Sequence, residues 1–146
     1  MSKKSMERGN SLVETALVLP SLLILFLGML EVGFFLFSHV QVANAAREGA
    51  RYGSLCRLQG NCDQLTAVVK TTVFAEAQFL NMTDAASGGN TTVLVQPATL
   101  TGVPAVGAPI TVTVTYKHSS PFVSNLVPMF PAQIPIRHSL VMHFDK

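Results

Sequence analysis

A long apolar run dominates the first third of the chain. Between Ala16 and Phe37, the only strongly polar side chains are those of Ser21 and Glu31. As an α-helix this run would be about 33 Å long, which is enough to cross a bilayer with some tilt. The pattern therefore predicts a membrane-spanning helix over residues 16–37.

The helix is expected to continue past the membrane. No proline follows Pro20 before Tyr52, and residues 43–46 favour helix. We therefore predict one helix from about Ser11 to Tyr52, in which the missing backbone donor of Pro20 allows a kink. Small residues along it would let neighbouring backbones approach closely. The positions expected to shape helix packing are Pro20, Gly28, Gly33, Gly49 and Gly53.

After residue 53 the pattern changes to that of a small mixed domain. Residues 62–80 carry apolar side chains at mostly helical spacing, with Asp63 near the start, and residues 81–90 are rich in turn-forming types. Three later segments have the composition of strands: 91–96, 109–117 and 136–144. We predict an α+β fold in which one further helix and about three antiparallel strands form a head against the second half of the long helix.

The middle strand shows the clearest alternation. Its apolar side chains are expected to face the core and its threonines to face water. The two sets are Ile110, Val112, Val114 and Tyr116 on one side, and Thr111, Thr113, Thr115 and Lys117 on the other. A proline-rich connection, residues 119–135, either covers the core or forms an exposed contact surface, and we favour the former.

The charge of the chain adds little to the predicted fold and class of protein. The chain has 10 Lys and Arg against 8 Asp and Glu, which is not the basic footprint of a nucleic-acid-binding protein. Basic residues lie on both sides of the apolar run, so the positive-inside rule gives a tie. They are Lys3, Lys4 and Arg8 before it, and Arg47, Arg51 and Arg57 after it. The compact leader, the cysteines and the polar head together favour a cytoplasmic amino terminus.

Two cysteines, Cys56 and Cys62, are separated by five residues in a polar segment. They would close a small loop in an oxidising compartment, with two free thiols as the alternative. The spacing and the lack of a nearby histidine do not suit zinc, so no metal site is expected.

Two alternatives concern processing and catalysis. The sequence Ala43-Asn44-Ala45 fits signal peptidase, but the apolar run is too long for a signal peptide. Catalysis would need a convergent acid, base or nucleophile. Histidines 118, 138 and 143 lie on or beside predicted strands, and His138 and His143 should face opposite sides. We expect no enzyme, no catalytic residue and no cofactor.

Two carboxylates interrupt the apolar region. Glu14 lies at the start of this region, where a charge near hydrocarbon costs about 2 to 3 kcal/mol or more without a partner. Glu31 lies about 25 Å further along the helix, near the outer edge of the hydrocarbon if Glu14 lies at the inner edge. Glu31 either contacts a neighbouring helix or extends towards the headgroups, and both readings stay open.

Ordered motifs in the first 53 residues resemble the TadE-like minor pseudopilin family of tight-adherence (Flp-type) pili. They are Arg8-Gly9-x4-Glu14, Ala16-Leu-Val-Leu-Pro20, Gly28-x-x-Glu31-Val-Gly33 and Ala45-Ala-Arg-Glu-Gly-Ala-Arg51-Tyr52. The resemblance covers about a third of the chain, and the head is only loosely similar. Thr15 departs from the pattern, since an aromatic residue commonly follows the glutamate in the family.

The resemblance implies a structural subunit with three parts: a leader, 1–9, a pilin-like helix, 10–53, and an external head, 54–146. A prepilin peptidase would cut between Gly9 and Asn10. Glu14 would then pair with the new amino group of an adjacent subunit, and Glu31 is a second candidate assembly residue. The implied partners are the peptidase, other pilins, the inner-membrane assembly platform and the bilayer, with no nucleic acid.

The implied location is the bacterial cytoplasmic membrane, with the amino terminus inside and the head outside, or the pilus after assembly. The alternative is an unprocessed single-pass membrane protein whose head binds another envelope protein.

Overall fold

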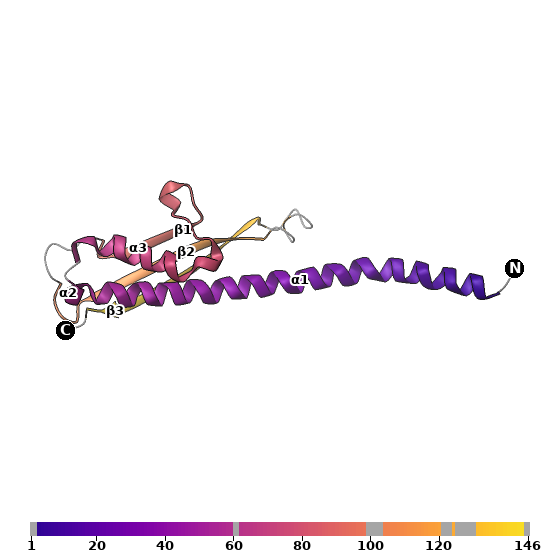
Figure 1. The fold of residues 1–146 in the computed structure, drawn as a ribbon, viewed down its shortest axis with the longest axis horizontal. Helices are drawn as coiled ribbons and strands as arrows, with labels where there is room; N and C mark the ends of the chain where they lie inside the picture. The colour runs from indigo at the N-terminus through magenta and orange to yellow at the C-terminus, as the bar shows by residue number, and fades with distance from the viewer. Residues whose placement is uncertain (1–2, 60–61, 99–103, 121–123, 125–130, 145–146) are drawn as a thin grey trace.

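A computed structural model of the chain describes residues 3–59, 62–98, 104–120, 124 and 131–144. A small head is carried on the carboxy-terminal half of one long helix, α1, whose other half extends away as a bare rod towards the amino terminus (Figure 1). Helix α3 and a three-stranded sheet make up the head. The predicted α+β architecture is thus confirmed.

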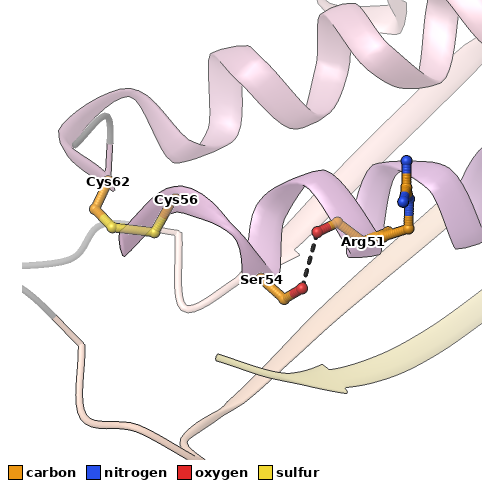
Figure 2. Close-up of a disulfide and its surroundings, with 4 residues drawn as sticks. All are labelled: Arg51, Ser54, Cys56 and Cys62. Carbon is orange, nitrogen blue, oxygen red and sulfur yellow. Dashed lines mark hydrogen bonds between the residues drawn. A yellow bond between two sulfur atoms is a disulfide. The ribbon is translucent and has the colours of Figure 1, made fainter. Parts of the chain in front are cut away.

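Helix α1 spans Lys3–Ser54, which is 52 residues, with Pro20 inside it. It begins well before the predicted Ser11 because the residues of the leader, apart from Gly9, are compatible with helix. At its other end the Ser54 hydroxyl donates to the Arg51 carbonyl at 2.8 Å (Figure 2). The chain then turns into the short helix α2, Cys56–Gln59.

Helix α3 spans Leu65–Glu76 and packs on α1. It is shorter than the predicted 62–80 because a 3₁₀ turn flanks it on each side: η1, Cys62–Gln64, and η2, Gln78–Leu80. Asp63 thus lies in η1 and not in the first turn of α3. Another 3₁₀ turn, η3, Ala85–Ser87, lies in the loop before the sheet.

The sheet has the order β1-β2-β3, and both pairs are antiparallel. The strands are β1, Thr91–Gln96, β2, Pro109–Ser119, and β3, Gln133–His143. The three predicted strands therefore exist, although β2 and β3 are longer than expected. Of the proline-rich connection, residues 121–123 and 125–130 lie outside the described part of the chain, so its predicted role is not addressed.

The core lies between α1, α3 and one face of the sheet. On β2 the side chains of Ile110, Val112 and Val114 are fully buried, as the alternation predicted. On the other face Thr113 is also buried, contrary to the expected wet face, and its Oγ1 lies 2.9 Å from Ser139 Oγ on β3. A cross-strand hydroxyl pair satisfies both groups and so permits that burial.

Candidate functional site

The bare half of α1 exposes most of its large apolar side chains. Among the described residues, one helix segment, Leu12–Ser54, is long and apolar enough to cross a membrane, with a mean hydropathy of 2.2 in its most apolar window. This is the pattern of a helix whose apolar surface is covered by lipid or by other helices. The exposed residues include Leu17, Leu22, Leu25, Phe26 and Met29.

Glu14 lies on this bare half, and its side chain is exposed in the isolated chain. Gly9 and Asn10 lie in the same helix, one turn or so before it. An α-helix rises about 6 Å over the four residues from Asn10 to Glu14. The head of the same chain therefore leaves Glu14 uncovered.

Gly28 and Gly33 are also on the open part of α1. A Cβ added at either would meet nothing within 4 Å in the described part of the chain. Space is therefore open beside both backbones, and their role in packing against a neighbouring helix stays a prediction. Gly49 and Gly53 behave differently, because they face the head.

The two glycines of the head-bearing half allow α1 and α3 to approach closely. A Cβ on Gly49 would lie 2.7 Å from Val73 Cγ2. On Gly53 it would lie 2.6 Å from Ile110 Cδ1 and 3.0 Å from Val69 Cγ2. These two positions therefore set the packing of the head on its own helix rather than contacts between subunits.

The two cysteines form a disulfide beyond the end of α1, with an S–S distance of 2.05 Å. Figure 2 shows it joining the start of α2 to the start of η1. Both side chains are buried with the core. The bridge thus fixes the turn through which the chain leaves α1 and enters α3.

Glu31 lies where the bare half of α1 meets the head. Its side chain is only 8% exposed, and both carboxylate oxygens lack a hydrogen-bond partner among the described residues. The two roles considered from the sequence, a helix contact and extension towards the headgroups, did not include burial beside the head. An ionisable group buried at the level of a membrane is a candidate functional residue.

A hollow of about 330 Å³ adjoins Glu31. Its wall combines aromatic side chains of α1 with residues of η2 and β2. The lining residues are Glu31, Phe34, Phe37, Ser38, Phe79, Leu80, Tyr116, His118 and Ser119. A second hollow of about 240 Å³ shares Glu31 and His118 and extends to Gly28, Val32 and Phe35. Glu31 therefore borders two spaces between the helix and the head.

Hydrogen bonds fix His118 in the wall of this hollow. The Ser38 hydroxyl donates to the Phe34 carbonyl at 2.9 Å, and its oxygen lies 3.1 Å from His118 Nδ1. Since a serine hydroxyl has a single proton, it accepts from Nδ1–H of His118. The ring also meets Phe35 edge-on at 5.7 Å between centroids.

Tyr116 completes the wall from the same strand. Its hydroxyl donates to the Leu80 carbonyl at 3.4 Å, and burial raises the pKa of the phenol. The phenol is therefore neutral at ordinary pH. Along the hollow, Glu31 shares its walls with aromatic rings and with the polar side chains of Ser38, His118 and Ser119, and no Lys or Arg is among the described lining residues.

A pair of histidines lies further along α1. His39 Nδ1 is 3.2 Å from His138 Nε2 on β3. Burial, then repulsion by His39 and Arg47, lowers the pKa of His138 below its usual value. Sequence reasoning singled out His138 but not His39, because a residue on the helix and another 99 positions away become neighbours only through the fold.

The geometry defines a class of protein, one in which a small α+β head is built on a single long helix with a bare apolar half. Residues 9–51 match the model of the TadE-like protein family. The match confirms the predicted resemblance over this segment of the chain. Two further comparisons of the chain, with curated proteins and with solved structures, found no match. The family match ends at residue 51 and does not extend into the head, residues 54–146.

Proposed function

We propose that the chain is a structural subunit, a minor pilin or pseudopilin of a Tad/Flp-type pilus or related secretion apparatus, and not an enzyme. The observation that carries the proposal is the TadE-like match over residues 9–51, which coincides with a helix whose apolar half is left uncovered by the head. A helix of this kind needs either lipid or other helices around it. A subunit that is first held in the membrane and then assembled into a pilus has lipid around this helix at first and other helices afterwards.

Processing is part of the proposal. A prepilin peptidase removes residues 1–9, and the new α-amino group belongs to Asn10. Glu14 is exposed on the bare half of α1, so its carboxylate is accessible to the amino group of an adjacent subunit. In an apolar helix bundle each charge then neutralises the other, and removing one partner of such a pair costs about 3 to 5 kcal/mol.

The proposed location follows from the same parts. The subunit waits in the bacterial cytoplasmic membrane with its amino terminus inside and its head outside, and it reaches the pilus on assembly. A head on the outer side is compatible with the Cys56–Cys62 disulfide, since such bonds persist in oxidising compartments. Its partners are the peptidase, other pilins and the assembly platform.

Mass spectrometry of the protein isolated from its native host tests the processing step. The expected amino terminus is Asn10. An amino terminus at Met1 or Ser2 in both the membrane-bound and the assembled protein would contradict the proposal.

Glu14→Ala separates the proposal from an unprocessed single-pass protein whose head binds an envelope partner. Under the proposal, incorporation into the pilus fails while the head stays folded. Under the alternative, membrane insertion and partner binding both survive the substitution. Glu48→Ala is a suitable control because Glu48 lies on the head-bearing half and pairs with Arg51 of its own helix at 2.9 Å.

A further inference from the structure

We propose that the hollow beside Glu31 binds a basic side chain, Lys or Arg, carried by a second subunit of the assembly. This inference deepens the proposed function and rests on it. It adds a contact other than the pairing of Glu14 with an amino terminus, and it involves the head.

The buried carboxylate supplies the first argument. Glu31 is 8% exposed, and neither of its oxygens has a partner among the residues that the structure describes. A carboxylate can accept several hydrogen bonds, and burying its charge is strongly unfavourable unless a cation pairs with it. The described lining residues of the adjoining hollow include no Lys or Arg, and the basic ring among them, His118, bonds to Ser38 while both Glu31 oxygens are left without a partner. We therefore expect the cation to come from another chain.

The aromatic wall supplies the second argument. Phe34, Phe37 and Tyr116 line the same hollow as the carboxylate. Aromatic faces attract ammonium and guanidinium groups, and apolar walls accommodate the methylene stems of Lys and Arg. A space of about 330 Å³ is ample for the end of one such side chain.

The rim of the hollow points to a protein partner. Phe79 is 85% exposed, Phe34 59% and Phe37 46%, although all three are large and apolar. Aromatic side chains are enriched at protein interfaces relative to the rest of the surface. The rim is continuous with the bare half of α1, where the proposed function places neighbouring helices.

A lipid headgroup fits less well. A phospholipid with an ammonium group also carries a phosphate a few bonds away. That phosphate would lie near Glu31 with no Lys or Arg among the described lining residues to balance it. A lone Lys or Arg brings only the positive charge.

Photocrosslinking in the native host tests the proposal with the full chain. A benzoylphenylalanine is placed at position 79 on the rim, and at position 94 as a control. Leu94 is 52% exposed on β1 and does not line the hollow. We expect position 79 to form an adduct with another subunit, and position 94 to form none with the same peptide.

The carboxylate is then removed without changing its shape. Glu31→Gln should lower the yield of the adduct about tenfold or more, as expected for loss of a buried charge pair. Glu48→Gln, which removes a half-buried carboxylate that pairs with Arg51 on the same helix, should leave the yield unchanged. Should Glu31→Gln fail to fold, as judged by loss of the disulfide, Phe37→Ala on the rim replaces it and is also expected to reduce the adduct.

Charge reversal gives the decisive readout. The crosslinked peptide identifies the partner's Lys or Arg, and changing it to Glu should abolish the adduct. Combining that change with Glu31→Lys should restore it. Restoration separates a charge pair from a purely structural role of Glu31.

Three results would overturn the proposal: an adduct with phospholipid alone, a protein adduct insensitive to Glu31→Gln, and failure of the reversed pair to restore it. The amino-terminal mass keeps this failure distinct from that of the proposed function. A chain that starts at Asn10 but shows any of these results retains its processing and loses only the Glu31 contact.

Discussion

The Nε2 atom of His138 on β3 lies 3.2 Å from the Nδ1 atom of His39 on α1, and the two rings meet edge-on with centroids 4.4 Å apart. One nitrogen has to donate and the other to accept, so the contact requires at least one neutral ring. Since β3 is an edge strand of the sheet, this pair is a polar link between the edge of the head and the helix that carries it.

Acidification is expected to weaken the head. Burial, His39 and Arg47 lower the pKa of His138 in the folded state, so between the folded value and the usual value near 6.5 the unfolded chain binds more protons. Stability is therefore fully present above about 6.5 and is lost as the pH falls towards the folded value. Thermal unfolding of the head measured from about pH 7.5 to about pH 5 should show this decrease.

Two matched variants test whether the His39–His138 pair causes that decrease in stability. His138→Gln should flatten the dependence on pH over this range. His143→Gln, at the exposed end of the same strand, should leave it as it is in the wild type. An unchanged slope in His138→Gln would contradict the assignment.

Gly49→Ala should destabilise the head. The added methyl group would lie 2.7 Å from Val73 Cγ2 and 3.3 Å from Val69 Cγ1 on α3. Overpacking of this kind costs about 1 to 3 kcal/mol, and the better helix propensity of alanine offsets up to about 1 kcal/mol of it. Denaturant unfolding followed by circular dichroism should thus show a net loss of up to about 2 kcal/mol.

Gly33→Ala is the control for that measurement. A Cβ at position 33 meets nothing within 4 Å in the described part of the chain, so the stability of the head should not fall. An effect as large as that of Gly49→Ala would show that the close approach of α1 and α3 is not the cause.

Removing the disulfide should cost about 2 kcal/mol, the value that the chain-entropy model gives for so short a loop. Replacing both Cys56 and Cys62 by Ser also introduces hydroxyls at buried positions, so the double change to Ala is the better variant. Chemical denaturation with and without a reductant measures the same quantity in the wild type. A reductant should have no effect on the double variant.

The loop before β1 is expected to depend on an ion pair. Lys70 Nζ on α3 lies 2.8 Å from Asp84 Oδ2, and the Asp84 carbonyl accepts from Gly89 N–H at 2.9 Å. Hydrogen bonding to Lys70, with a further bond from Ala86 N–H, lowers the pKa of Asp84. Lys70→Met should therefore speed amide exchange at Gly89.

Val93, in the middle of β1, provides the internal reference for that exchange measurement. Its backbone belongs to the paired strand, so its amide should exchange at the wild-type rate. Equal acceleration at both positions would indicate general destabilisation instead of release of the loop.

Local patterns were sufficient to predict much of the fold. The apolar run and the alternation of Ile110, Val112 and Val114 report the periodicity of a helix and of a strand, and both were found where expected. The ends of the elements were less accurate. The start of α1 at Lys3 and the limits of α3 depend on weak helix preferences and on 3₁₀ turns, which leave little trace in a sequence.

The site was less predictable because it depends on tertiary contacts. The sequence placed Glu31 on the helix but could not show that Tyr116 and His118, which follow more than 80 positions later, line a hollow beside it. The same holds for Gly49, which was expected to let a backbone pack closely against either the head or another subunit. Only the fold shows that its close neighbour is α3 of the same chain.

The unbroken α1 has a mechanical consequence. Because one helix forms both the bare rod and the support of the head, no joint separates them, and a pull on the amino-terminal half is transmitted along the helix axis (Figure 1). The load then acts in shear on the contacts that Val42, Ala46 and Ala50 make with the core of the head. The Cys56–Cys62 disulfide links the chain covalently at the far end of this contact. Withdrawal of the helix from a bilayer would therefore translate the head by the same distance as the helix.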